Sequence, residues 1–150
     1  MADIGITFTL QVQFNIIKKV KNFVRITLRE IKELIVKIKP SKIRGGKTMN
    51  QPKILVVDDD KEIVGAIKKR LEMEDYEIIT AYNGLEAMDV LMEQDVQLLI
   101  IDVMMPKMDG WQVCREIRAH SRVPIIMLTA KSDEQDELMG FDLGVDEYIS

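Results

Sequence analysis

The sequence predicts an α/β fold in residues 49–150: a doubly wound, five-stranded parallel sheet, preceded by a basic amphipathic extension in residues 1–48. Short apolar runs alternate with segments of helical period, which is typical of βαβ units with helices on both faces of a sheet. In addition, three of the apolar runs end in polar residues, and the sign of the charge reverses near residue 48.

The expected strands are short and rich in branched apolar residues. They cover residues 53–57, 76–80, 96–101, 123–128 and 145–149. The first, KILVV, is apolar throughout, as expected for a central strand that is covered on both faces. Helices are predicted around Ile63–Leu71, with Asp60 as the cap, and around residues 88–92, 111–117 and 133–142; Asn83-Gly84 is expected to form a turn.

Charge is distributed unevenly along the chain. Residues 1–48 carry eleven Lys/Arg against three Asp/Glu, a net +8, whereas residues 49–150 carry ten against twenty-two, a net −12. A breaker-rich stretch from Pro40 to Gly46 separates the two parts and is interpreted as a linker. The acidic domain also has no basic groove with interleaved aromatic residues, which argues against direct DNA binding by this part.

The basic segment contains two different periodicities. Residues 6–14 alternate apolar and polar side chains, which predicts a strand. Apolar residues then recur at helical steps: Ile16, Ile17, Val20, Phe23, Val24, Ile31, Leu34, Ile35 and Ile38. An amphipathic helix of this kind docks on an anionic membrane or on a partner. The alternative hypothesis is that translation begins at Met49 and that residues 1–48 are not part of the working protein.

Other sequence features limit the class of protein. No apolar run approaches the roughly 20 residues of a membrane-spanning helix, and the N-terminus does not have the pattern of a signal peptide. The single cysteine, Cys114, cannot form an intrachain disulfide, which favours a reducing, cytoplasmic setting.

Polar residues follow three of the predicted strands: Asp58, Asp59 and Asp60 the first, Asp102 the third and Thr129 the fourth. The carboxyl ends of parallel strands meet at one edge of the sheet, where ligands bind. Carboxylates that converge there repel one another, and Mg²⁺ prefers such oxygen ligands. A carboxylate beside the metal can attack phosphorus, and the Thr129 hydroxyl can reach a phosphoryl oxygen. Taken singly, each of these residues fits an ordinary cap or turn as well.

Four motifs, KILVVDDD, IDVMMPKMDG, PIIMLTA and LGVDEYIS, occur in order over residues 53–150. Together they resemble the receiver domains of two-component response regulators, and most closely those that precede winged-helix DNA-binding domains. The resemblance implies a flavodoxin-like fold with strand order 2-1-3-4-5. It also implies that Asp102 accepts a phosphoryl group from a histidine kinase. Asp58, Asp59, Asp102 and the Met104 carbonyl would then bind Mg²⁺.

The same resemblance implies a switch role for Thr129, which moves toward the phosphoryl group, and for Tyr148, which swings inward when the threonine moves. The sequence departs from the family pattern at the C-terminus. A lysine that pairs with the phosphoacceptor has no counterpart, and Lys131 follows Thr129 too closely to be assumed a substitute. The family's last helix is missing as well, so we expect apolar surface to be exposed on one side of the sheet.

The resulting functional expectation is a signalling switch and not an enzyme with an external product. Its partner is a sensor histidine kinase. Transcription regulation and DNA contact belong to an output domain absent from these residues, and a homodimer is expected for the full-length form; no membrane partner is expected. Two alternatives stay open. One is a non-functional receiver fragment. The other is a phosphohydrolase similar to the haloacid dehalogenases, with Asp58 as nucleophile and Asp60 two residues later.

Overall fold

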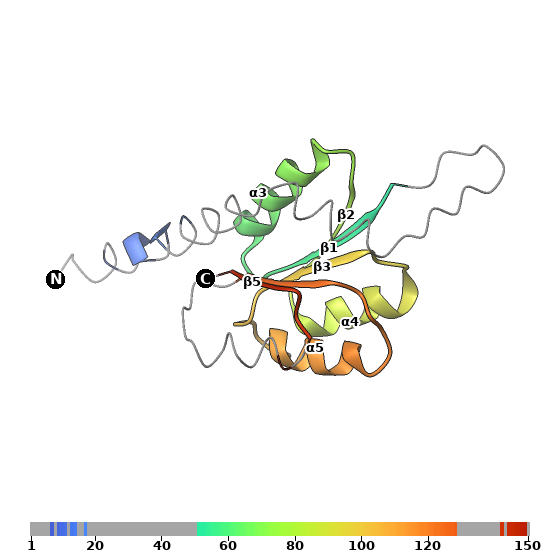
Figure 1. Ribbon diagram of the computed structural model, residues 1–150. Coiled ribbons are helices and arrows are strands. Elements are labelled where there is room, and N and C mark those ends of the chain that lie inside the picture. Colours follow the sequence, from blue (N-terminus) through green and yellow to red (C-terminus); the bar gives the residue numbers. More distant parts are fainter. Residues whose placement is uncertain are drawn as a thin grey trace.

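The computed structural model describes residues 51–128, 142 and 144–149, together with Thr7, Thr9, Leu10, Gln11, Gln13, Phe14 and Ile17. The strands are β1 (Lys53–Val57), β2 (Glu77–Ala81), β3 (Leu98–Ile101), β4 (Ile125–Leu128) and β5 (Glu147–Ile149). The helices are α3 (Lys61–Glu72), α4 (Gly84–Glu93) and α5 (Gly110–Arg118). All strand pairs are parallel, in the order β2-β1-β3-β4-β5, which confirms the predicted doubly wound sheet (Figure 1).

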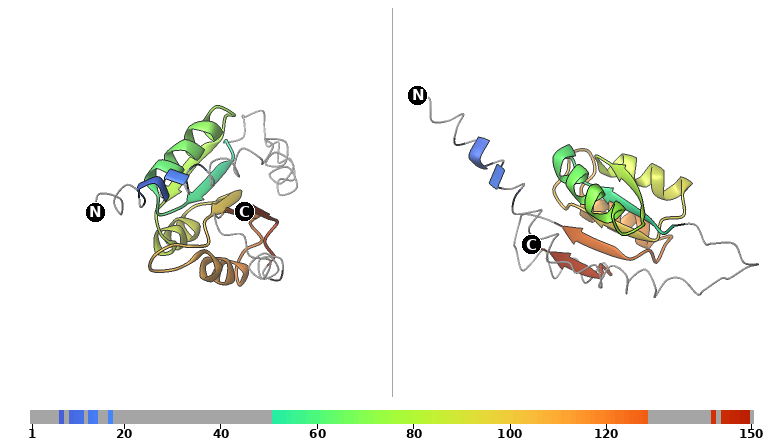
Figure 2. Two further views of the ribbon diagram at one scale, coloured as in Figure 1. Left: turned by 90° about the vertical axis from the view of Figure 1, so that its left-hand side faces the viewer. Right: turned by 90° about the horizontal axis from the view of Figure 1, so that it is seen from above.

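Alternate residues of the central strands enter two separate cores. In β1, Leu55 and Val57 pack toward α4 and α5, whereas Ile54 and Val56 pack toward α3. Two further views show α3 on one side of the sheet and α4 and α5 on the other (Figure 2). Because both faces are covered, the strand has to be apolar at every position, which explains the KILVV run.

Side chains at the starts of α3, α4 and α5 satisfy the first backbone N–H groups. Asp60 caps α3 as predicted, and Asp109 forms a capping box with Gln112 at the start of α5. The turn predicted at Asn83-Gly84 is wrong, because Asn83 is the N-cap of α4 and Gly84 is its first helical residue. Asparagine serves both purposes, since its side-chain oxygen accepts from backbone N–H groups in turns and at caps alike.

The strand predicted for residues 6–14 is also wrong. The described residues from Thr7 to Ile17 are helical, and Leu10, Phe14 and Ile17 follow one another at steps of four and three, so they share one helix face. A helix bonds its backbone groups within the segment, whereas a strand needs a neighbour to pair with. None of the helices in the described part of the chain has the length and hydropathy of a membrane span.

The expectation that one side of the sheet is left exposed does not hold for the described strand residues. On the α3 side, Ile126 and Leu128 of β4 have exposed fractions of 0% and 2%. Some part of the molecule therefore covers β4 on this side. The predicted helix at residues 133–142 lies outside the described residues except for Asp142, which is helical.

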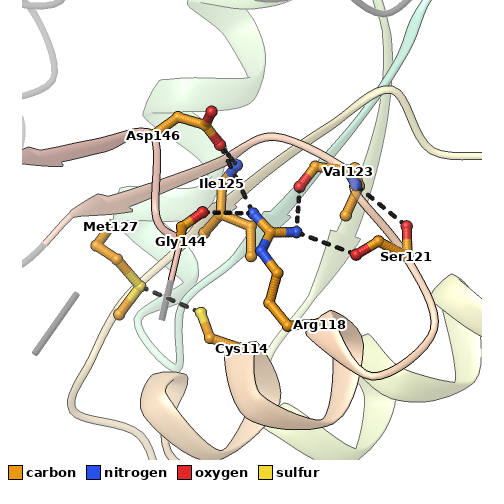
Figure 3. A network of polar contacts seen from close by, with 8 residues as sticks. All are labelled: Cys114, Arg118, Ser121, Val123, Ile125, Met127, Gly144 and Asp146. Carbon is orange, nitrogen blue, oxygen red and sulfur yellow. Dashed lines mark hydrogen bonds and ion pairs between the residues drawn. The ribbon is translucent and has the colours of Figure 1, made fainter. Parts of the chain in front are cut away.

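Arg118, in the last turn of α5, connects the segment that precedes β4 with the segment that precedes β5 (Figure 3). Its guanidinium donates to the carbonyl oxygens of Val123 at 2.6 Å and Gly144 at 2.8 Å. It also lies 3.6 Å from Asp146, whose carboxylate accepts from the backbone N–H of Ile125 at 2.9 Å. One side chain thus ties α5 to the loop before β5.

Replacing Arg118 with alanine should remove these contacts and leave two carbonyls without their charged donor. We expect the free energy of unfolding to fall by about 2 kcal/mol or more, measured by urea denaturation. Arg70→Ala is the matched control, because Arg70 is 45% exposed and forms only a surface pair with Glu74; its cost should be about 0.5 kcal/mol or less. Equal costs for the two variants would contradict this role of Arg118.

The thiol of Cys114 should be unreactive in the folded protein. It is fully buried, 3.5 Å from the sulfur of Met127. Burial raises the pKa of the Cys114 thiol to about 12, with Arg118 and Arg115 opposing the rise and Asp109 adding to it. At pH 8 a disulfide reagent that releases a coloured thiol should therefore react slowly without urea and rapidly in urea. Rapid reaction of the native protein would show that this core opens readily.

Candidate metal centre

The centre lies where two neighbouring strands end. The last residues of β1 and β3, Val57 and Ile101, are partners in the parallel register. The next residue in each chain segment is an aspartate, Asp58 after β1 and Asp102 after β3. The backbone N–H of Asp102 donates to the Val57 carbonyl at 3.0 Å, which continues the ladder one step beyond the strands.

This register brings three carboxylates together. One oxygen each from Asp58, Asp59 and Asp102 lie within 4.8 Å of one another. Asp58 and Asp102 are buried, with exposed fractions of 2% and 1%, whereas Asp59 is exposed. Three like charges at this spacing repel one another strongly where the surroundings exclude water. The arrangement costs stability unless a cation or a proton offsets the charge.

The acidic residues after β1 have two different roles, one at the metal centre and one at the start of α3. The Asp60 carboxylate accepts from the backbone N–H groups of Glu62 at 2.9 Å and Ile63 at 3.3 Å, and so caps α3. The backbone N–H of Asp60 in turn donates to the Asp58 carboxylate at 2.9 Å. This bond turns Asp58 toward the centre while Asp60 points to the helix. A phosphohydrolase that uses Asp58 and Asp60 as its catalytic pair is therefore not favoured.

The loop after Asp102 is fixed from the other side by Gly110. Its N–H donates to the Val103 carbonyl at 2.9 Å. A Cβ at residue 110 would collide with the Asp102 carbonyl oxygen and lie only 3.0 Å from the Val103 Cα. Between them, Lys107 has a φ of 69°, and the Met108 N–H donates back to the Pro106 carbonyl at 2.8 Å, which closes a γ-turn. The backbone around Asp102 is thus held by close packing.

The donor set fits a hard divalent cation. Three carboxylates from two strand ends supply oxygen ligands only, and an exposed member leaves one side open to water or to a phosphate oxygen. Mg²⁺ prefers such ligands and keeps several positions for water and substrate, whereas zinc sites usually include nitrogen or sulfur. The residues present therefore suit Mg²⁺.

The remaining predicted site residues are placed only in part. Met104 lies in the loop two residues after Asp102, with its side chain 59% exposed. Tyr148 is in β5, where its backbone is paired with Met127 of β4; its side chain lies outside the description. Thr129 and Lys131 also lie outside the described residues, so their predicted roles stay predictions.

The role of Gly110 was not anticipated from the sequence. Only the folded structure shows how closely the backbone of Gly110 approaches Asp102. The available signal was a glycine at the first position of a helix, where another residue would support the helix better.

Comparison with known proteins relates this chain to a known domain family. A family model described as the response regulator receiver domain matches residues 54–150. A probable transcriptional regulator of Cyanophora paradoxa, ycf27, is 46% identical over 101 residues, which are 67% of this chain and 42% of that protein. The chain thus spans less than half the length of this curated relative.

Solved structures agree with this match. The response regulator TrrA of Thermotoga maritima, solved in complex with Mg²⁺ and a beryllium fluoride, is 39% identical, with a TM-score of 0.61 over 66% of this chain and 85% of that one. The chemotaxis protein CheY4 of Vibrio cholerae is 30% identical, with a TM-score of 0.63 over 65% of this chain and 84% of that one.

Gly110→Ala should disturb the centre, because the new methyl group would push against the backbone of Asp102. We expect the free energy of unfolding to fall by at least about 2 kcal/mol, together with weaker Mg²⁺ binding in a calorimetric titration. Gly65→Ala is the control: it lies within α3, and nothing stands within 4 Å of its added Cβ. The free energy of unfolding of Gly65→Ala should rise by about 0.5–1 kcal/mol. Unchanged stability and Mg²⁺ affinity in Gly110→Ala would contradict the close packing.

Proposed function

The chain belongs to the response regulator receiver domain family, and we propose that it is a phosphorylation-dependent switch with Asp102 as its phosphoacceptor. The observation that carries the proposal is the set of three carboxylates at the ends of β1 and β3. Two of its members are buried, and Asp102 stands at the end of the central strand, behind a loop whose backbone is closely packed.

In the proposed reaction, a carboxylate oxygen of Asp102 forms a bond to phosphorus while the bond between phosphorus and the kinase histidine nitrogen breaks. The bonding electrons leave with that nitrogen, which takes up a proton, and Asp102 becomes an acyl phosphate. Asp58 and Asp59, with the Met104 carbonyl, would hold Mg²⁺, which offsets negative charge on the transferring group. The Asp60 N–H keeps the Asp58 carboxylate oriented throughout.

The response to phosphorylation is assigned to two further residues. Thr129, directly after β4, would donate its hydroxyl to a phosphoryl oxygen, and Tyr148 of β5 would turn inward as Thr129 moves. β4 and β5 are directly paired in the sheet, so a movement of Thr129 at the end of β4 can be transmitted to β5 through the backbone hydrogen bonds between the two strands. The phosphoryl charge would then shift the balance between two conformations of this edge.

The proposed partners follow from family membership. A sensor histidine kinase supplies the phosphoryl group, in the cytoplasm. Similarity to a transcriptional regulator supports an output in transcription through a DNA-binding domain outside these residues. A homodimer in the full-length form is a further part of the proposal. By this proposal residues 49–150 form the receiver and residues 1–48 a separate extension.

Incubation with acetyl phosphate and Mg²⁺ tests the acceptor. Intact-protein mass spectrometry should show one added phosphoryl group, and borohydride trapping followed by peptide mapping should place it on Asp102. Asp102→Asn should abolish the label, while Asp95→Asn, an exposed carboxylate outside the cluster, should keep it. A label on Asp58 would favour the phosphohydrolase, and the absence of any label would favour a non-functional fragment.

Removing the metal tests the cluster itself. Mg²⁺ with beryllofluoride should raise the melting temperature, because a ligand at about 100 times its dissociation constant stabilises the native state by about 2.7 kcal/mol. EDTA should reverse this rise, and Asp59→Asn should reduce it while Asp95→Asn leaves it unchanged. If Asp59→Asn responds like the unmodified chain, Asp59 is not a ligand.

A further inference from the structure

A strip of the sheet on the α3 side is buried although, among the strands, α3 packs mainly on the two that lie beside this strip. We call it the β3–β4 strip; its residues are Leu98, Ile100, Ile126 and Leu128. Their exposed fractions are 0%, 1%, 0% and 2%. All four belong to the same core as the apolar face of α3. Such complete burial requires a cover over each of the two strands.

One helix is too narrow to supply it. Five strands at about 4.8 Å spacing make a sheet about 19 Å wide, whereas a helix with its side chains is about 10 Å across. Among the sheet strands, α3 packs mainly on β1 and β2, the two strands that it connects. The opposite face has both α4 and α5 (Figure 2). A second element is therefore needed beside α3.

The connection between β4 and β5 is not expected to cover the β3–β4 strip. Right-handed crossovers put all connections that run in the same direction across the sheet on the same face. The step from β1 to β2 runs one way and carries α3, whereas the step from β3 to β4 runs the other way and carries α5. A step from β4 to β5 has the direction of the α5 step. Its right-handed path therefore passes over the face that α4 and α5 occupy.

The remaining chain is the N-terminal segment, which has the required character. Its apolar stripe continues from Val20 to Ile38, 19 residues that as a helix would reach about 28 Å, longer than any strand of the sheet. Its net charge of +8 is opposite to the −12 of residues 49–150. Residues 39–50 can span up to about 40 Å, enough to return to the start of β1. Ile17 is 51% exposed, so the covering part begins after it.

We propose that residues 20–38 dock in cis on the β3–β4 strip, beside α3, and complete the second core of the sheet. The stripe packs on the strand residues, and the lysines and arginines of the segment face the solvent. This gives residues 1–48 a structural role in the chain. Translation that began at Met49 would leave the strip without this cover.

Two adjacent substitutions test the docking in the full chain. Leu34→Gln changes the stripe, whereas Glu33→Gln places the same side chain on the opposite helix face. Leu34→Gln should lower the melting temperature by at least about 5 °C, as expected when a buried leucine is lost from a small domain. Glu33→Gln should change it little. Equal melting temperatures for the two variants would overturn the proposal.

Hydrogen exchange of the full chain supplies a second, independent readout. Amides in residues 20–38 should exchange at least about 100-fold more slowly than in an unstructured peptide, and open together with the strands of the sheet. Fast exchange there, with the strands still protected, would overturn the docking. Light scattering separates the remaining case: a dimer that Leu34→Gln turns into a monomer would assign the cover to a second copy, whereas an oligomeric state that Leu34→Gln leaves unchanged agrees with docking in cis.

Discussion

The parallel pairing of β1 with β3 is the constraint on which the rest of the structure depends. It sets Val57 beside Ile101, and each strand is followed at once by an aspartate. A slip of one residue would turn the apolar side chains of a strand to the opposite core and would separate Asp58 from Asp102. Because the apolar runs end at Val57 and Ile101, a slip of either strand would draw a carboxylate into the apolar core, and this cost fixes the register that also assembles the centre.

The cluster opposes the fold that creates it. Two buried carboxylates and a third within 4.8 Å lower the stability of the folded state until charge is neutralised. The surrounding backbone keeps its position despite this repulsion because hydrogen bonds and close packing fix it from several sides. The Asp60 N–H orients Asp58, the Val57 carbonyl accepts from Asp102, and Gly110 lets its helix approach the Asp102 backbone. A local conflict of this kind, supported by rigid neighbours, is characteristic of functional sites.

The sequence was informative where a pattern has one physical explanation. Apolar runs gave all five strands to within about two residues, and the acidic residues after two of them gave the cluster. It misled where one pattern serves two structures. Alternation in residues 6–14 suits a strand only if a neighbour pairs with it, and Asn83 suits a turn as well as a cap. The close approach of Gly110 and the burial of Ile126 depend on distant segments, so no local pattern reveals them.

The most direct measurement is the position of a bound cation. Mn²⁺ takes the same oxygen ligands as Mg²⁺ and is visible by anomalous scattering, so crystals of the chain soaked in Mn²⁺ locate the site without assuming it. We expect one strong peak between the carboxylates of Asp58, Asp59 and Asp102, and its loss in Asp59→Asn crystals. Crystals with full Mn²⁺ occupancy elsewhere and no peak among these three carboxylates would contradict a metal centre at this position.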